Sequence, residues 1–423
     1  MDGNQGKIVV VNWKSNLFVI WLSQFLAMVG FGCCMPFIPL LLKENLNIDD
    51  PNLRGVYTNI YYLASMVSLC IATSVWGMLA DRFGRKLMLL RASYAAALFY
   101  PLLAFAPNFW VLAGIRFVCS FFSGTVNPAQ TLLIATTPKE KHGFVLGVLS
   151  TGTNSGNMLG YLLGAEIVER FGYTQAFLTC GAIYLTSALL VHIFARDDFN
   201  VKLAKKQRQK SQYKFKNVAT PAVIWLLVLF LCFGVSNRLL QPNMALLVEK
   251  VLGTIKGAAR YTGIVSAAAS IGGFLAGLCM GWLCDRIAPR KLMLPILILS
   301  SIFTVALALS TNVYMLIASR FLGAFAICGI QPVLQLMLTK ITRPELRGTY
   351  FGWSGSVNTA GGIVCSLLGG TVVWFCGIRG VYIASAVILA IMIPIFIPTV
   401  MAMKKEFVTD PDAAGRDLKD ALN

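Results

Sequence analysis

Charged residues are scarce in this chain. Lysine, arginine, aspartate and glutamate together make up 13% of its 423 residues, about half the share in a typical soluble domain. Hydrophobic residues make up 57%, and the mean hydropathy is +0.70. A soluble domain of this composition would expose far too much apolar surface to water. The composition therefore excludes a soluble globular protein and indicates a polytopic membrane protein.

Groups for acid-base, metal or phosphate chemistry are also few. There are only two histidines, His142 and His192, and the eighteen carboxylates lie in loops, in the tails or at the ends of apolar runs. The eleven cysteines form no CxxC pair, and no glycine-rich loop precedes a Lys-Ser/Thr pair. We therefore expect no enzyme activity, no cofactor and no metal site, and ATP-driven transport is disfavoured.

Long apolar runs are what the chain does contain. A run of about 20 residues is enough to cross the hydrocarbon core of a bilayer. The first run is too long for a cleavable signal and lacks a small-residue cleavage site, so we expect it to remain as the first span. Twelve spans are predicted, at residues 16–42, 55–79, 87–106, 109–134, 143–168, 173–195, 220–248, 260–284, 292–310, 313–338, 348–373 and 379–400.

The net charge of +18 reflects topology rather than a nucleic-acid partner. Of the 36 lysines and arginines, only seven fall on one predicted side, namely Lys43, Arg54, Arg170, Lys250, Lys256, Arg260 and Arg379. Three more, Arg116, Arg238 and Arg320, lie inside predicted spans. All the other lysines and arginines fall on the opposite side. The positive-inside rule places that richer side, with both termini, in the cytoplasm.

A short cluster of charged residues, which we call a knot, lies between the second and third spans and recurs later in the chain. "GMLADRFGRKLML" runs from Gly77, and "GWLCDRIAPRKLML" begins 204 residues later at Gly281. The same offset aligns Arg116 with Arg320, so the two halves are duplicates. Six spans per copy is an even number, which makes the copies parallel repeats. We predict an all-α membrane protein with six-helix bundles at 1–195 and 218–403, a basic cytoplasmic linker at 196–217 and a cytoplasmic tail at 404–423.

The first knot closely resembles the G-x-L-a-D-R-x-G-R-K/R signature of the major facilitator superfamily. "NWKSNLFVIWL", "MPFIPL", "LIATTPKEKHGFVLGVLSTGTNSG" and "RFLGAF" further resemble the bacterial drug:proton antiporter branch, nearest to MdtG-like multidrug efflux proteins. The resemblance implies the major facilitator fold and a bacterial inner membrane. The chain departs from that branch's fifth-span signature, because Tyr161 replaces its proline and Ala165 its last glycine.

We expect residues of the two knots to form a cytoplasmic gate. In the resembled family the aspartate of the first knot clasps the opposite half and holds the cytoplasmic side shut, and acidic charge is favourable at a helix start such as that of the eleventh span. The plainer alternative is that a short cytoplasmic turn simply collects positive charge. The expected gate residues are Gly77, Asp81, Arg82, Gly84, Arg85, Lys86, Asp285, Arg286 and Arg347.

Polar stripes at helical spacing indicate the substrate cavity. An arginine facing hydrocarbon costs several kcal/mol, yet Arg116 heads such a stripe in the fourth span and Arg320 a similar one in the tenth. Spans one, four, seven and ten line the central cavity in the resembled family. The alternative is that these arginines bond backbone carbonyls between neighbouring spans. The expected cavity residues are Gln24, Met28, Phe31, Arg116, Ser120, Asn127, Arg238, Gln241, Arg320, Gln331 and Gln335.

Arg238 breaks the duplication, since its counterpart is Cys34. It lies about 25 Å along the seventh span from Pro221, where it either contacts an anionic substrate or snorkels to the outer headgroups. The stripe of Gln24, Met28 and Phe31 in the first span is either packing or pocket.

Glycines at four-residue spacing recur in the fifth and eleventh spans. Small residues on one face let helices approach closely. The expected interface glycines, which either meet across the two halves and permit sliding or serve static packing, are Gly156, Gly160, Gly164 and Gly361.

These features favour a secondary transporter that works by alternating access, most plainly one that exports drugs or amphipathic molecules by proton antiport. The alternative is a carrier or exchanger of organic anions, such as carboxylate or phosphate compounds, because Arg116, Arg238 and Arg320 meet no carboxylate within the spans. A non-transporting receptor is a third hypothesis, against which the duplicated knots argue. We expect a small-molecule substrate, protons as the coupling ion, a lipid bilayer around a monomer, and no nucleic acid.

Overall fold

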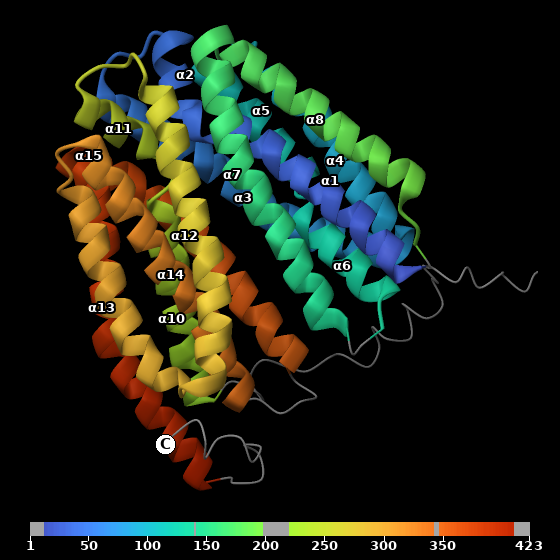
Figure 1. The fold of residues 1–423 in the computed structure, drawn as a ribbon, viewed down its shortest axis with the longest axis vertical. Coiled ribbons are helices and arrows are strands. Elements are labelled where there is room, and N and C mark those ends of the chain that lie inside the picture. The colour runs from blue at the N-terminus through green and yellow to red at the C-terminus, as the bar shows by residue number, and fades with distance from the viewer. Residues whose placement is uncertain (1–11, 139–140, 198–219, 342–346, 410–423) are drawn as a thin grey trace, which may run out of the picture.

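Every regular element that the computed structural model describes is a helix (Figure 1). The described residues are 12–138, 141–197, 220–341 and 347–409. The predicted linker beyond Asp197 and the tail beyond Thr409 lie outside them. The first half contains α1 (Trp13–Cys34), η1 (Met35–Phe37), α2 (Ile38–Glu44), α3 (Pro51–Phe83), α4 (Arg85–Leu103), α5 (Phe109–Phe122), α6 (Val126–Thr136), α7 (His142–Phe171) and α8 (Tyr173–Phe194).

The second half repeats this order with fewer breaks. Its elements are α10 (Pro221–Leu239), α11 (Met244–Leu252), α12 (Ala258–Arg286), α13 (Pro289–Ala308), α14 (Val313–Ile341) and α15 (Arg347–Thr409). α15 contains the last two predicted spans, which Gly377 separates with a φ of 70°. Each of the twelve predicted spans therefore has its helical counterpart, and the all-α fold class is confirmed.

Three predicted spans are broken rather than continuous. The first consists of α1, η1 and α2, with Pro36 at the junction, and the seventh consists of α10 and α11, with Pro242 between them. Proline lacks the N–H that would continue the helix. The fourth stops at Phe122 and resumes at Val126, because Gly124 adopts a φ of 103°, a conformation that glycine adopts without strain.

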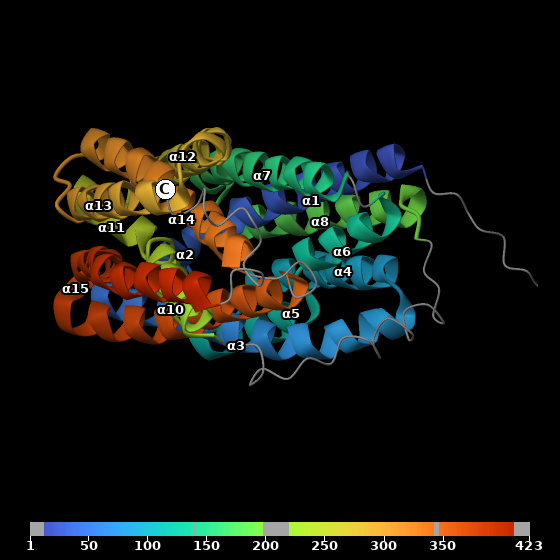
Figure 2. The same ribbon diagram turned by 90° about the horizontal axis from the view of Figure 1, so that it is seen from below.

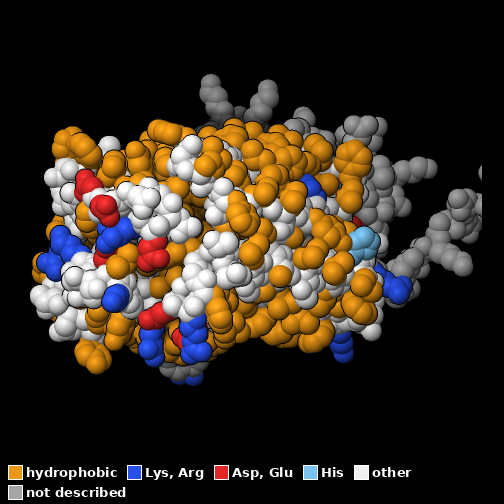
Figure 3. Space-filling model, turned by 90° about the horizontal axis from the view of Figure 1, so that it is seen from above, with side chains coloured by type: hydrophobic (Ala, Val, Ile, Leu, Met, Phe, Trp, Pro, Cys, Tyr) orange, Lys and Arg blue, Asp and Glu red, His pale blue; other side chains and the backbone are white. Residues whose placement is uncertain are grey.

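The outer surface is suited to lipid. Within the described ranges, nine helical stretches are long and apolar enough to cross a membrane, the last of them holding two predicted spans. Large apolar side chains such as Trp110 and Phe375 are exposed. Figure 3 shows hydrophobic side chains over most of one face, with charged side chains gathered on one part of it.

The two halves lie side by side, and each packs mainly around an apolar core of its own. Ile20 and Phe177 belong to cores of the first half, and Phe230 and Tyr382 to that of the second. α7 contacts α12 and α3 contacts α15 across the boundary. Figure 2 shows most helices of the first half on the right and most of those of the second half, together with α2, on the left.

The predicted interface glycines do not lie between the halves. A Cβ added to Gly156, Gly160 or Gly164 of α7 would overlap the backbone of α1, and one added to Gly361 would press on α10. All four therefore bring together helices of the same half, as static packing requires. The expectation that they meet across the two halves is wrong, because four-residue spacing reveals a close contact but not which helix makes it.

α7 and α12, which contact each other across the boundary, lie close together at one end of the molecule and diverge toward the other (Figure 1). We call the end near α2 and α11 the latch end, and the opposite end, where α1 begins and α15 ends, the terminal end. Toward the latch end a Cβ on Gly55 would overlap Val373, and one on Gly263 would overlap Ala165, each from the other half. Toward the terminal end a Cβ on Gly147 or Gly352 would meet nothing within 4 Å.

Candidate functional site

A central cavity of about 480 Å³ lies between the halves. This is within the usual size range of small-molecule sites. Both halves contribute to its wall, the first mainly through α7 and the second mainly through α10, α12 and α14. The predicted cavity residues that line it are Phe31, Gln241, Arg320, Gln331 and Gln335.

The polar stripe of α14 faces this cavity along its length. Arg320 is 8% exposed, and its Nε has no hydrogen-bond partner. Sequence reasoning missed the facing wall of α7, where Asn154 and Asn157 line the cavity. They occur in "STGTNSGN", and a search for amides at helical spacing would have found them. The central cavity thus offers amide groups and one cation to a ligand.

A second cavity, which we call the side cavity, lies within the first half. It has a volume of about 450 Å³ and is lined from α1, α3, α4, α5, α6 and α8. The polar stripe of the fourth span faces it, including Gly124 at the break between α5 and α6. The predicted cavity residues that line it are Met28, Phe31, Arg116, Ser120 and Asn127. The two stripes therefore open into different cavities, and Phe31 lines both.

Arg116 is held by aromatic side chains. Its Nη1 donates to the Tyr100 hydroxyl at 3.2 Å, and its guanidinium lies 5.3 Å from the centre of the Tyr61 ring. Only 5% of Arg116 is exposed. The alternative in which it bonds a backbone carbonyl is not what the structure shows. Aromatic faces attract a desolvated cation, so these rings stabilise the buried charge without neutralising it.

A second arginine of the side cavity was not anticipated. Arg91 of α4 lies 3.8 Å from the centre of the Trp76 ring, and both residues line the cavity. The indole N–H of Trp76 donates to the Phe121 carbonyl at 2.7 Å, which fixes the ring. The sequence signal was present in "GRKLMLLRA", but Arg91 was assigned to the cytoplasmic charge of the knot.

Arg238 and Gln24 line neither cavity, contrary to expectation. The Nη1 of Arg238 donates to both the carbonyl and the side-chain oxygen of Asn358 on α15. It therefore ties α10 to α15 rather than reaching a substrate or the headgroups. Gln24 is fully buried in the first half, and neither polar atom of its amide has a hydrogen-bond partner.

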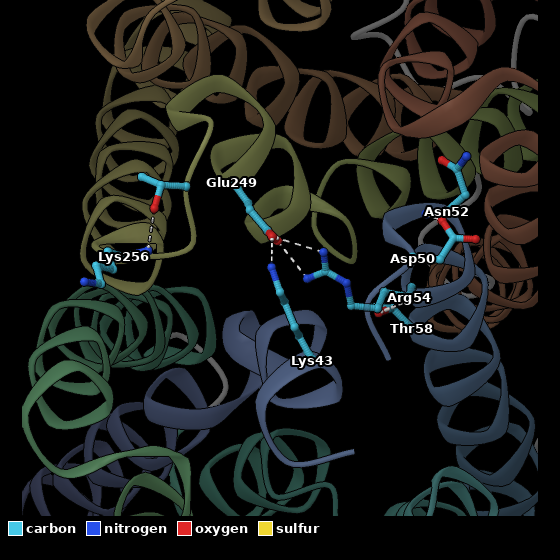
Figure 4. Close-up of polar contacts among 8 residues, drawn as sticks. Lys43, Asp50, Asn52, Arg54, Thr58, Glu249 and Lys256 are labelled. Carbon is cyan, nitrogen blue, oxygen red and sulfur yellow. Dashed lines mark hydrogen bonds and ion pairs between the residues drawn. The ribbon is translucent and has the colours of Figure 1, made fainter. Parts of the chain in front are cut away.

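Three charged side chains join the halves at the latch end, and we call them the interhalf latch (Figure 4). Arg54 of α3 donates to both oxygens of Glu249 on α11, at 2.7 and 3.1 Å. Lys43 of α2 donates to Glu249 at 3.0 Å. Arg54 is fully buried, and Lys43 is partly exposed. The sequence placed these residues on one side of the membrane but could not pair them.

The latch keeps Glu249 ionised. Burial raises the pKa of its carboxyl, but the hydrogen bonds and charges of Arg54 and Lys43 outweigh burial and leave that pKa below its ordinary value. A buried arginine with a bidentate carboxylate partner is a strong and directional contact. Next to the latch, the Asn59 amide donates to Asn243 of the other half at 3.4 Å.

The first knot is tied to its own half. Gly84 has a φ of 94° and forms the turn between α3 and α4. The backbone N–H groups of Arg85 and Lys86 both donate to Asp197 at 2.9 Å. An acceptor at a helix start satisfies donors that the helix itself leaves free, so Asp197 fixes the knot onto the end of α8. In the sequence, Asp197 is only one residue of the predicted linker.

The other predicted gate residues are only partly described. Gly77, Asp81 and Arg82 belong to α3, and Arg286 is exposed at the end of α12. The side chains of Asp81, Arg82, Asp285 and Arg347 lie outside the described part of the structure. The predicted clasp of Asp81 on the eleventh span therefore stays a prediction.

Comparison with known proteins agrees with this architecture. A family model for the Major Facilitator Superfamily matches residues 20–255 and 243–419. The multidrug resistance protein MdtG of Proteus mirabilis is 29% identical over 378 residues, which are 89% of this chain and 94% of that protein. MdtG of Klebsiella pneumoniae is also 29% identical, over 89% of this chain and 91% of that protein.

Solved structures share the fold. A bacterial homolog of the human lysosomal transporter Spinster, in an inward-facing and unoccupied conformation, has a TM-score of 0.73 at 16% identity and covers 93% of this chain and 98% of its own. The nucleoside transporter NupG has a TM-score of 0.70 at 15% identity, covering 93% and 100%. The human organic anion transporter MFSD10 has a TM-score of 0.62 at 14% identity, covering 91% and 100%.

Proposed function

The chain belongs to the Major Facilitator Superfamily, and we propose that it exports drugs or other amphipathic small molecules by proton antiport. As a member of that family it is a multi-pass membrane transporter of small molecules and not an enzyme. The step to drug export rests on its similarity to the multidrug resistance proteins of two bacteria. We place it in a bacterial inner membrane.

The central cavity is the observation that carries this proposal. It lies between the halves and is lined from both, and the interhalf latch joins the halves at one end. Toward the terminal end α7 and α12 diverge (Figure 1). A cavity between two repeats that opens to one side at a time is what alternating access requires. Since one chain completes it, we propose a monomer as the working unit.

The positive-inside rule gives the direction of this opening. It places the terminal end, with both termini, in the cytoplasm, and the latch then closes the outer side. The conformation seen here is accordingly open to the cytoplasm and ready to accept substrate from it. In the opposite state, we propose that Asp81 of the first knot meets the start of α15 and closes the cytoplasmic side.

The organic-anion carrier remains the second candidate, favoured by one observation. The charged residues that line the cavities, within the described part of the chain, are Arg91, Arg116 and Arg320. A cavity with fixed positive charge attracts anions and repels cations.

Transport into proteoliposomes distinguishes the candidates. We expect a cationic dye to accumulate only with a pH gradient if drug:proton antiport is correct. Accumulation of a dicarboxylate instead, independent of the gradient, would support the anion carrier. Neither compound moving under either condition would reject both.

A matched pair of variants on α14 ties this transport to the central cavity. Ala324→Trp fills that cavity and should abolish transport. Leu322→Trp adds the same ring two residues away, at a position 38% exposed and so directed to lipid, and should transport normally.

A further inference from the structure

We propose that the side cavity binds an amphipathic organic anion, with Arg91 contacting its acidic group and an apolar wall holding its body. This proposal deepens the second candidate function, the organic-anion carrier, and rests on it. The side cavity is separate from the central cavity and belongs to the first half alone.

Arg91 has hydrogen-bonding capacity that the protein leaves unused. Its Nε and Nη1 are buried and have no partner, while its guanidinium stacks on Trp76. Burying such donors unpaired costs free energy. A carboxylate, sulfonate or phosphate matches the planar fork of arginine through two hydrogen bonds, and the stacked indole holds that fork in place.

Arg116 adds positive charge deeper in the same cavity. Tyr100, which holds Arg116, lies nine residues beyond Arg91 on α4, a distance of about 13 Å along the helix. Arg116 already has a hydroxyl partner and two aromatic faces, although its Nε is unpartnered. Arg91 is therefore the better contact for an acidic group, and Arg116 reinforces the positive field.

The rest of the wall suits an apolar body. Met28, Leu69, Met88 and Tyr184 also line the cavity, and flexible thioethers adapt to varied shapes. None of the described lining residues is acidic, so the two arginines keep their net positive charge. Phe31 lines both cavities, so the side cavity adjoins the central one at this side chain.

Equilibrium binding of three probes of one shape tests the proposal. The full chain in nanodiscs of zwitterionic lipid is titrated calorimetrically with naphthalene-2-sulfonate, naphthalene-2-sulfonamide and 2-naphthylmethylammonium. The sulfonate should bind at least about tenfold more tightly than the neutral sulfonamide, and the cation most weakly. Equal affinities for the sulfonate and the sulfonamide would overturn the proposal.

Variants then assign the charge selection to Arg91. Arg91→Gln should weaken sulfonate binding about 10- to 100-fold, as expected for lost charge-assisted hydrogen bonds, and change sulfonamide binding less than about twofold. Arg170→Gln removes an exposed arginine of the same half and should change neither. An unchanged sulfonate affinity in Arg91→Gln, or equal losses for both probes, would contradict the assignment.

Two further variants keep the test decisive if Arg91→Gln does not fold. Leu69→Trp fills the side cavity without changing charge and should remove binding of both naphthalene probes. Arg91→Lys keeps the charge but loses the planar fork, and should retain only part of the preference for the sulfonate. Full sulfonate binding in Leu69→Trp would place the anion elsewhere and reject the site. Because these measurements concern binding, failure here leaves gradient-driven transport of a cationic dye to be judged separately.

Discussion

Arg54 of the first half and Glu249 of the second form a two-point ion pair across the boundary between the halves, with N–O distances of 2.7 and 3.1 Å. Arg54 has no exposed surface. Lys43 shares the same carboxylate, so a single acidic group serves two cations. The closed latch end therefore depends more on Glu249 than on either base.

Replacing Glu249 with Gln should open the latch end. Truncating one partner of a buried, hydrogen-bonded charge pair costs about 2–5 kcal/mol, and here that cost falls only on the closed state. Spin labels at the exposed positions Asn45 and Thr254, with the accessible cysteines replaced, should report longer distances between the halves.

Lys43→Met provides the matched control for the latch. This side chain is 29% exposed, and an exposed ion pair contributes only about 0.2–1 kcal/mol. The distance between the labels at Asn45 and Thr254 should shift far less in Lys43→Met than in Glu249→Gln. Equal shifts in the two variants would mean that the buried pair has no special role.

Strong acid on the latch side should open the latch end by protonating Glu249. The pKa of Glu249 is lowered in the closed latch and returns toward its ordinary value of about 4.3 once the partners separate. A lowered pKa favours the closed state above that ordinary value, and the advantage is lost as the pH falls through the lowered pKa. We expect label distances at the latch end to lengthen below about pH 4, and Glu249→Gln to abolish this response. A pH response that survives in Glu249→Gln would come from another group.

The contact between α7 and α1 should not tolerate a methyl group. A Cβ at Gly164 would overlap the backbone of Cys33, whereas one at Gly147 of the same helix meets open space. Overpacking costs about 1–3 kcal/mol, so Gly164→Ala should lower the thermal unfolding temperature in detergent. Gly147→Ala should leave it unchanged or slightly higher, and a similar loss in both would show that glycine flexibility, rather than close packing, matters here.

Arg238 should affect stability and not charge selection. Its hydrogen bonds to Asn358 join two helices of one half, and removing hydrogen bonds to a charged group costs about 1.5–3 kcal/mol. Arg238→Ala should therefore lower thermal stability while changing the affinities for anionic and neutral ligands equally. A selective loss of anion affinity would return Arg238 to the substrate site.

The proposed cytoplasmic gate can be tested with labels at the terminal end. If Asp81 interacts with the start of α15 in the cytoplasm-closed state, Asp81→Asn should destabilise that state, because a neutral amide interacts more weakly with a helix start. Labels at the exposed positions Leu87 and Gly352 should lose the shorter part of their distance distribution. An unchanged distribution would remove Asp81 from the gate and leave the knot as a topology signal.

Much of this protein follows from one-dimensional patterns. Apolar runs long enough to cross a bilayer fixed the number of spans, because burial in lipid depends on length and hydropathy alone. Helical spacing gathered the stripes of Arg116 and Arg320 correctly, since a period of 3.6 residues determines which side chains share a face. The expectation of one central cavity for both was wrong for Arg116, because its stripe lines the side cavity and only that of Arg320 lines the central cavity.

The sequence could not predict which residues far apart in the chain contact each other. Helical spacing groups side chains on a face but does not orient that face, so the sequence left open whether Gly156, Gly160 and Gly164 pack within one half or across the two. Glu249 and Arg54 are 195 residues apart, and Arg238 and Asn358 are 120 apart. Such contacts depend on the rotation and tilt of whole helices, which many weak packing interactions set together. The sequence by itself determined the membrane, the spans, the repeat and the family, while only the tertiary structure decided which charges meet and which end of the protein is closed.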